Sequence, residues 1–148
     1  MNPAVAQERS GWRDFVLSQR HRTWGFDCPC LDIDFLVVEY DQGRVVCLVE
    51  YKHEIARPHS IGHPSFQALA DLADRARIPF FECRYATDLS WFEVTPINGF
   101  AIRKFHPGRR CSEREWVTLL YSMRGRPIPF DVSNFLDSEE WRRTPSSF

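Results

Sequence analysis

The residues best suited to chemistry stand at the two ends of one hairpin-like stretch. Asp32 and Asp34 begin an apolar run, and Glu50 and Lys52 end the next apolar run. A short turn containing Gly43 separates the two runs, which are rich in β-branched and aromatic residues. This pattern predicts an antiparallel β-hairpin. Such a hairpin would bring the four charged residues together.

The expected pairing makes the chemistry specific. With a three-residue loop over 41–43, Asp34 lies opposite Glu50, and Asp32 lies opposite Lys52. Alternation along a strand puts all four side chains on one face. Opposed Cβ atoms lie about 4.5–5.5 Å apart, and two carboxylates that close repel each other unless a cation lies between them. Hard cations such as Mg²⁺ are bound by one or two carboxylates, waters and substrate phosphates.

Lysine usage favours a special role for Lys52. The chain has 19 Lys and Arg residues in total, and only Lys52 and Lys104 are lysines. A compact ammonium is therefore used at position 52 where arginine serves almost everywhere else, and the two groups are not interchangeable. The alternative is a structural salt bridge between Glu50 and Lys52 at the strand end. A charge cluster on a buried strand is costly, which favours a functional interpretation.

An acidic residue, two apolar runs around a turn, and then Glu-x-Lys resemble the core of the PD-(D/E)xK nuclease superfamily. The matching residues are Asp34 or Asp32, together with Glu50 and Lys52. The family's Pro-Asp pair is not intact, because Pro29 stands three residues before Asp32. The choice between Asp32 and Asp34 as the first metal ligand therefore stays open.

The resemblance implies an α/β fold with a restriction endonuclease-like core, in which helices flank a mixed central β-sheet. It covers residues 8–100, and we expect residues 101–148 to form a helical extension of the same single domain. It also implies an Mg²⁺- or Mn²⁺-dependent endonuclease that hydrolyses DNA phosphodiester bonds. The alternative is a nuclease-fold module that has lost its chemistry and binds nucleic acid or regulates a partner.

The resemblance also implies roles for single residues. The metal ligands would be Asp34 and Glu50, with the Tyr51 carbonyl and Asp32 as further candidates. Lys52 would orient the attacking water or stabilise the charge that develops on the phosphate. Two supporting residues are suggested by their placement on helices next to the hairpin, namely Glu8 and Gln67.

The charge distribution suits a polyanionic partner. Residues 27–54 hold seven acids and two bases, whereas residues 103–126 hold seven bases and two acids. An acidic centre with basic flanks fits a metal site that attracts DNA. Ordinary scatter of surface charge is the alternative, and nothing in the sequence separates DNA from RNA. A homodimer would suit double-strand cleavage, but it has no sequence signature here. Candidate phosphate contacts are Arg20 and Arg22 at a helix end, Arg109 and Arg110 in a basic turn, and Arg124 and Arg126.

The remaining elements follow from periodicity and turn residues. A helix between two strands implies that those strands are parallel. The second and third core strands are expected to have this arrangement, with the third and fourth strands joined by a short turn. The predicted elements are helices over 8–20, 65–77 and 112–123, strands over 78–85 and 91–97, and another strand over 100–106.

Composition limits the class of protein. The chain has 148 residues, 43% of them hydrophobic, and a formal net charge of −1, which indicates one globular domain. It has no apolar stretch near 18 residues, so no membrane span is expected. Five cysteines show no framework spacing, and the reducing cytoplasm is the expected compartment.

Overall fold

The computed structural model divides the chain into two units, Met1–Asp32 and Ile33–Phe148, which are described separately. In the first unit the described element is helix α2 (Phe15–Trp24). This helix continues past the expected end at Arg20. The residues that the structure describes are 15–25, 29–57, 62–105 and 109–145.

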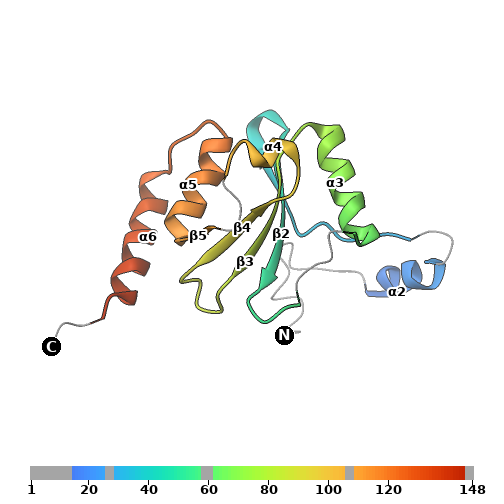
Figure 1. The fold of residues 1–148 in the computed structure, drawn as a ribbon, viewed down its shortest axis with the longest axis horizontal. Helices are drawn as coiled ribbons and strands as arrows, with labels where there is room; N and C mark the ends of the chain where they lie inside the picture. The colour runs from blue at the N-terminus through green and yellow to red at the C-terminus, as the bar shows by residue number, and fades with distance from the viewer. Residues whose placement is uncertain (1–14, 26–28, 58–61, 106–108, 146–148) are drawn as a thin grey trace. The chain divides into compact units, whose positions relative to one another are not determined.

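A five-stranded sheet forms the centre of the second unit (Figure 1). The strands follow one another across the sheet in sequence order. The second and third strands are parallel and the other neighbours are antiparallel, so the predicted mixed sheet is confirmed. The strands are β1 (Phe35–Glu39), β2 (Arg44–His53), β3 (Phe80–Tyr85), β4 (Phe92–Pro96) and β5 (Arg109–Cys111).

The β1–β2 hairpin has a different loop from the expected one, yet it keeps the expected register at its open end. Glu39 pairs with Arg44, so the loop has four residues, with a 3-10 turn followed by Gly43 at φ 59°. A bulge between Val37 and Val38 then shifts the pairing. Beyond it Phe35 faces Val49, and one further step of this register would bring Asp34 level with Glu50.

Helices cover both faces of the sheet, with α3 on one side and α5 and α6 on the other (Figure 1). The α/β prediction is therefore confirmed. The helices of this unit are α3 (Pro64–Ala76), α4 (Gly99–Ile102), α5 (Glu113–Met123) and α6 (Phe130–Arg143).

Some local predictions were wrong. Helix α3 begins at Pro64, one residue before the expected start, and the His63 ring Nδ1 caps it by accepting from the Ser65 amide. Residues 99–102 form helix α4 where a strand was expected, because Asn98 caps them by accepting from the Ala101 amide. Helix α5 lies where a helix was predicted, and Ser112 and Glu115 are bonded reciprocally in a capping box at its start.

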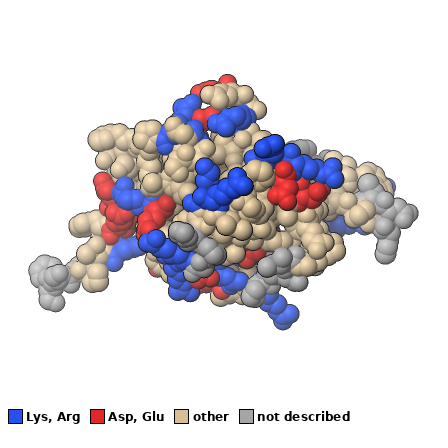
Figure 2. Space-filling model, turned by 45° about the horizontal axis from the view of Figure 1, so that its top comes forward, with Lys and Arg blue, Asp and Glu red and all other residues tan. Residues whose placement is uncertain are grey.

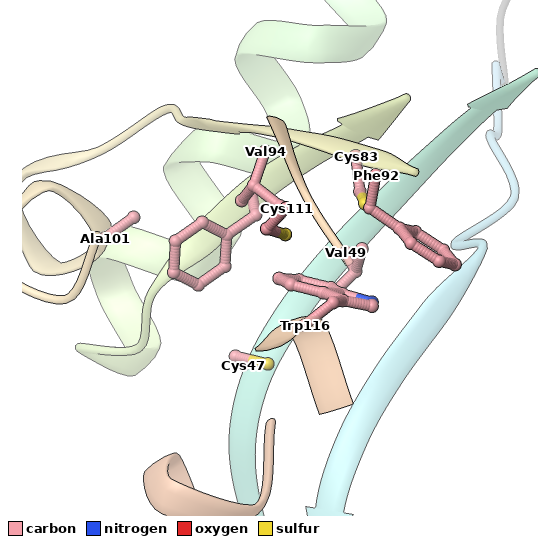
Figure 3. Packing of buried hydrophobic residues seen from close by; sticks show 9 residues of the cluster. Cys47, Val49, Cys83, Phe92, Val94, Ala101, Cys111 and Trp116 are labelled. Carbon is pink, nitrogen blue, oxygen red and sulfur yellow. The ribbon is translucent and has the colours of Figure 1, made fainter. Parts of the chain in front are cut away.

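Two apolar clusters sandwich the sheet. Their separation follows from strand alternation, since neighbouring residues of β2 point to opposite faces. Leu48 packs toward α3, whereas Cys47 and Val49 pack toward α5 around the buried Trp116 (Figure 3). The cluster under α3 contains Leu48, Phe66, Leu69, Ala73, Ile78 and Phe80.

Asn98 ties α3, β3 and α4 together beneath the surface. Its Oδ1 accepts from the amides of Phe80 and Ala101 at 3.1 and 3.0 Å. Its Nδ2 donates to the Ile78 carbonyl and to the Asp74 carboxylate at 2.9 and 3.0 Å. Because the side chain is buried, these bonds replace water that it cannot reach.

Candidate metal and nucleic-acid site

Asp34 caps the end of strand β2. Its Oδ2 accepts a hydrogen bond from the Tyr51 amide at 3.2 Å. Tyr51 lies between Glu50 and Lys52, so this bond attaches the Asp34 carboxylate to the middle of the Glu-x-Lys sequence. The hairpin therefore assembles the three residues that were predicted to be catalytic.

Glu50 and Lys52 form an ion pair on the same strand. Lys52 Nζ lies 3.3 Å from Glu50 Oε1. The Lys52 side chain is only 21% exposed and the Glu50 side chain only 12%. They stand two residues apart and so share the sheet face that packs against α3 further along the strand. A partly desolvated pair of this kind is held in place more firmly than a surface pair. The salt bridge considered as the structural alternative is thus present, and it does not exclude a catalytic role.

Strand β3 adds a second acid–base pair beside the first. Glu82 is the Cα partner of Glu50, and Arg84 is the Cα partner of Lys52. Sequence reasoning missed this pair, although Glu82-Cys83-Arg84 repeats the Glu-x-base spacing of residues 50–52. Adjacent strands lie about 4.8 Å apart, so the two glutamates are neighbours on one sheet face. This face of the two strands therefore carries two carboxylates and two basic groups close together.

The loop after β2 is held in place by two sets of hydrogen bonds. Arg84 Nη1 donates to the carbonyls of Glu54 and Ala56, both at 3.0 Å. Thr87 Oγ1 donates to Glu54 Oε1 at 2.8 Å and bonds the His53 ring Nε2 at 2.9 Å. The His53 Nδ1 accepts from a backbone amide, so Nε2 carries the proton. These contacts fix the strand end that carries Lys52.

The oxygen donors at this end of β2 suit a hard divalent cation that takes only part of its ligands from the protein. Among the described residues, no three His, Cys, Asp or Glu side chains form a group that could hold a metal ion. Mg²⁺ typically takes only one or two carboxylates and keeps several waters. Asp34 and Glu50, with the Tyr51 carbonyl, match that smaller requirement. Water and phosphate oxygens would complete the shell.

The predicted phosphate contacts fall in several places. Arg20 and Arg22 are exposed on α2 in the first unit. Arg109 and Arg110 lie on edge strand β5, where a turn was expected, because this segment pairs with β4. Both are exposed, with Glu115 3.7 Å from Arg109 and Glu93 3.1 Å from Arg110.

Two other arginines form a structural ion-pair cluster. Arg124 contacts Oε1 of the buried Glu39 at 2.7 and 3.0 Å, and Arg126 Nε contacts Oε2 at 2.8 Å. The hydrogen bond from Arg124, with the charges of both arginines, lowers the pKa of Glu39. The interpretation of Arg124 and Arg126 as phosphate contacts is therefore unsupported. The sequence around Arg124 and Arg126 gave no sign that both arginines would pair with Glu39.

Three further residues were predicted to support the site or bind the metal. Gln67 is exposed in the first turn of α3. Asp32 is exposed in the first unit. Glu8 lies outside the described residues. Their supporting or ligand roles stay predictions.

The opposite face of the same strand end is apolar and aromatic. The Tyr51 hydroxyl accepts from Trp116 Nε1 at 2.9 Å, and burial raises the pKa of Tyr51 above its ordinary value. Tyr51 also lines a cavity of about 380 Å³ on this face. The cavity is lined by Phe35, Tyr51, Tyr85, Leu89, Phe92, Glu113, Trp116, Val117 and Leu120. The Tyr51 side chain thus packs into the core, whereas Glu50 and Lys52 point to the opposite face of the sheet.

Charged side chains of both signs are interspersed on the face shown in Figure 2. Basic groups stand near its middle and carboxylates near both sides.

No helix within the described part of the chain is both long and apolar enough to cross a membrane. No protein-family model, curated protein or solved structure matches this chain significantly.

Proposed function

We propose that this protein is a metal-dependent nuclease that hydrolyses DNA phosphodiester bonds, with a restriction endonuclease-like core. The observation that carries the proposal is the meeting of Asp34 with the Glu50-Tyr51-Lys52 segment through the 3.2 Å bond to the Tyr51 amide. Strands β2 and β3 are parallel, and α3 connects them along the chain. Both features are consistent with such a core.

The chain's own groups have distinct tasks in this proposal. Asp34 and Glu50 bind Mg²⁺ or Mn²⁺, together with the Tyr51 carbonyl. The bound cation supplies Lewis-acid polarisation of the phosphate and a more readily ionised water. Lys52 orients the attacking water or stabilises the negative charge that grows on the phosphate oxygens. The ion pair with Glu50 keeps the Lys52 ammonium at the strand end for that task.

A second candidate is a nuclease-fold module that binds nucleic acid without cutting it. The observation in its favour is that Lys52 is already paired with Glu50, while Asp34 is bonded to a backbone amide. In that state both groups have structural partners. The two candidates differ in whether the carboxylates take up a metal.

Calorimetric titration of Mn²⁺ tests the proposal directly. Wild type should bind, and Glu50→Gln should weaken binding at least about tenfold because one anionic ligand is lost. Glu139→Gln is the matched control, since Glu139 also pairs with a nearby base but lies on α6. Its affinity should equal that of wild type. DNA binding with no Mn²⁺ uptake by any variant would instead favour the silent module.

A further inference from the structure

A charged row runs across four strands from the candidate site. Lys52 on β2 is the Cα partner of Arg84 on β3, which pairs with Glu93 on β4, which pairs with Arg110 on β5. Partners across a sheet point to the same face, so the four side chains lie on the face that carries Glu50. The row contains three cations and one anion. It spans three strand spacings, or about 14 Å.

The inner part of the row is fixed in position. Arg84 is half-buried, and its Nη1 is committed to the carbonyls of Glu54 and Ala56. These neutral acceptors orient the guanidinium without cancelling its charge. Arg84 therefore keeps a positive potential beside Lys52.

The outer end of the row is a stacked pair. The guanidinium carbon of Arg110 lies 4.0 Å from the centre of the Trp91 ring, and its Nε bonds Glu93 Oε2 at 3.1 Å. The Arg110 side chain is 60% exposed. Stacking on Trp91 and the bond to Glu93 hold the planar group still, so it offers a fixed plane and outward N–H donors. Fixed guanidinium and aromatic planes are surfaces on which unpaired bases stack, and their donors fit phosphate.

We propose that this row binds a single-stranded DNA segment next to the candidate active site, with Arg110 and Trp91 as its outer anchor. The proposal rests on the nuclease function proposed above and specifies its substrate. The excess of cations over anions within the row favours a polyanion, although Lys52 and Arg110 also pair with Glu50 and Glu93, and the stacked pair favours an unpaired base. At about 14 Å the row covers only a few nucleotides, so it positions the strand beside Lys52 and Glu50.

The test is fluorescence anisotropy of a labelled single-stranded 20-mer at several salt concentrations, with Ca²⁺ in place of Mg²⁺. Arg110→Gln should weaken binding about 5- to 10-fold and lower the slope of log affinity against log salt by about 0.7, the contribution of one phosphate contact on a single strand. Arg110→Lys should retain the salt slope because it keeps the charge. Arg75→Gln is the matched control, since Arg75 is an exposed arginine paired with a carboxylate on α3.

The outcomes separate this proposal from the nuclease proposal. Unchanged affinity and slope for Arg110→Gln, in protein that melts like wild type, would overturn the row while leaving cleavage untouched. Tighter binding of a duplex through the same arginine would overturn the choice of a single strand. If Arg110→Gln loses binding as expected but wild type cuts nothing with Mg²⁺, the row stands and the nuclease function fails. Should Arg110→Gln not fold, Trp91→Leu tests the outer anchor in its place and should weaken binding of the same 20-mer.

Discussion

Substitutions at Asp34 separate a catalytic carboxylate from a structural strand cap. The Asp34 carboxylate is exposed, and it accepts a hydrogen bond from the Tyr51 amide at 3.2 Å. Asp34→Asn keeps an oxygen acceptor for the Tyr51 amide and loses the negative charge. Asp34→Ala loses both. A net hydrogen bond contributes about 0.5–1.5 kcal/mol, so the alanine variant should lose about 0.5–1 kcal/mol in the free energy of unfolding, and the asparagine variant less.

The expected effect of the asparagine variant on activity is much larger. Metal polarisation supplies several kcal/mol of transition-state stabilisation, and each 1.36 kcal/mol is a factor of ten. Asp34→Asn should therefore slow DNA cleavage by about 100-fold or more while the protein remains as stable as wild type. Urea denaturation and a cleavage time course on the same preparations measure both quantities.

Asp88 supplies a matched control for this reasoning. Asp88 is also exposed, and its Oδ1 accepts a hydrogen bond from the Ser90 amide at 3.0 Å. Asp88→Asn makes the same chemical change on the β3–β4 turn and should leave cleavage unchanged. If Asp34→Asn cuts DNA as fast as Asp88→Asn, the carboxylate of Asp34 is only a strand cap. The assignment of Asp34 as a metal ligand would then be refuted.

Three further predictions concern the fold. Asn98→Ala should lower the free energy of unfolding by about 2–3 kcal/mol, because it leaves buried backbone groups unpaired, and a urea midpoint near that of wild type would contradict this. The lowered pKa of Glu39 means that its stabilising contribution is full above its ordinary pKa of 4.5 and is lost as the pH falls through the lower folded value. The Tm advantage of wild type over Glu39→Gln should therefore shrink below about pH 4.5, and a constant advantage down to pH 3 would refute the ion-pair cluster. Burial raises the thiol pKa to about 12 for Cys47 and to about 11 for Cys111, so iodoacetamide at pH 8 should modify exposed Cys30 and spare these two, as peptide mass spectrometry will report.

The hairpin could be predicted because its signals are local. Two apolar runs of β-branched residues around a glycine turn specify antiparallel strands, and alternation then specifies which charged residues share a face. The loop length was not predictable in the same way. The bulge between Val37 and Val38 compensates for a loop one residue longer than expected, so the pairing of Phe35 with Val49 has the predicted register.

Contacts between distant segments could not be predicted from the sequence. Glu82 and Arg84 become neighbours of Glu50 and Lys52 only through the β2–β3 register, which depends on how α3 crosses the sheet. The two-arginine cluster around Glu39 joins residues 85 and 87 positions apart in the chain. Local propensity carries no information about such pairs.

Short elements near residues 99–111 were mispredicted because tertiary contacts decide them. Residues 99–102 form a helix because Asn98 both caps them and bonds the start of β3. Arg109 and Arg110 form a strand because β4 offers an open edge. A strand of three residues has too few side chains to show a periodic pattern.

The nuclease proposal is tested most directly by cleavage of labelled plasmid and single-stranded DNA with Mg²⁺, Mn²⁺ or EDTA. Wild type and Lys52→Ala should be assayed side by side, with Lys104→Ala as the control because Lys104 is the other lysine of the chain and is exposed. The account predicts cutting by wild type and Lys104→Ala that requires the metal, is abolished by EDTA and is lost in Lys52→Ala. Equal cutting by Lys52→Ala, or no cutting by folded wild type with either metal, would contradict it.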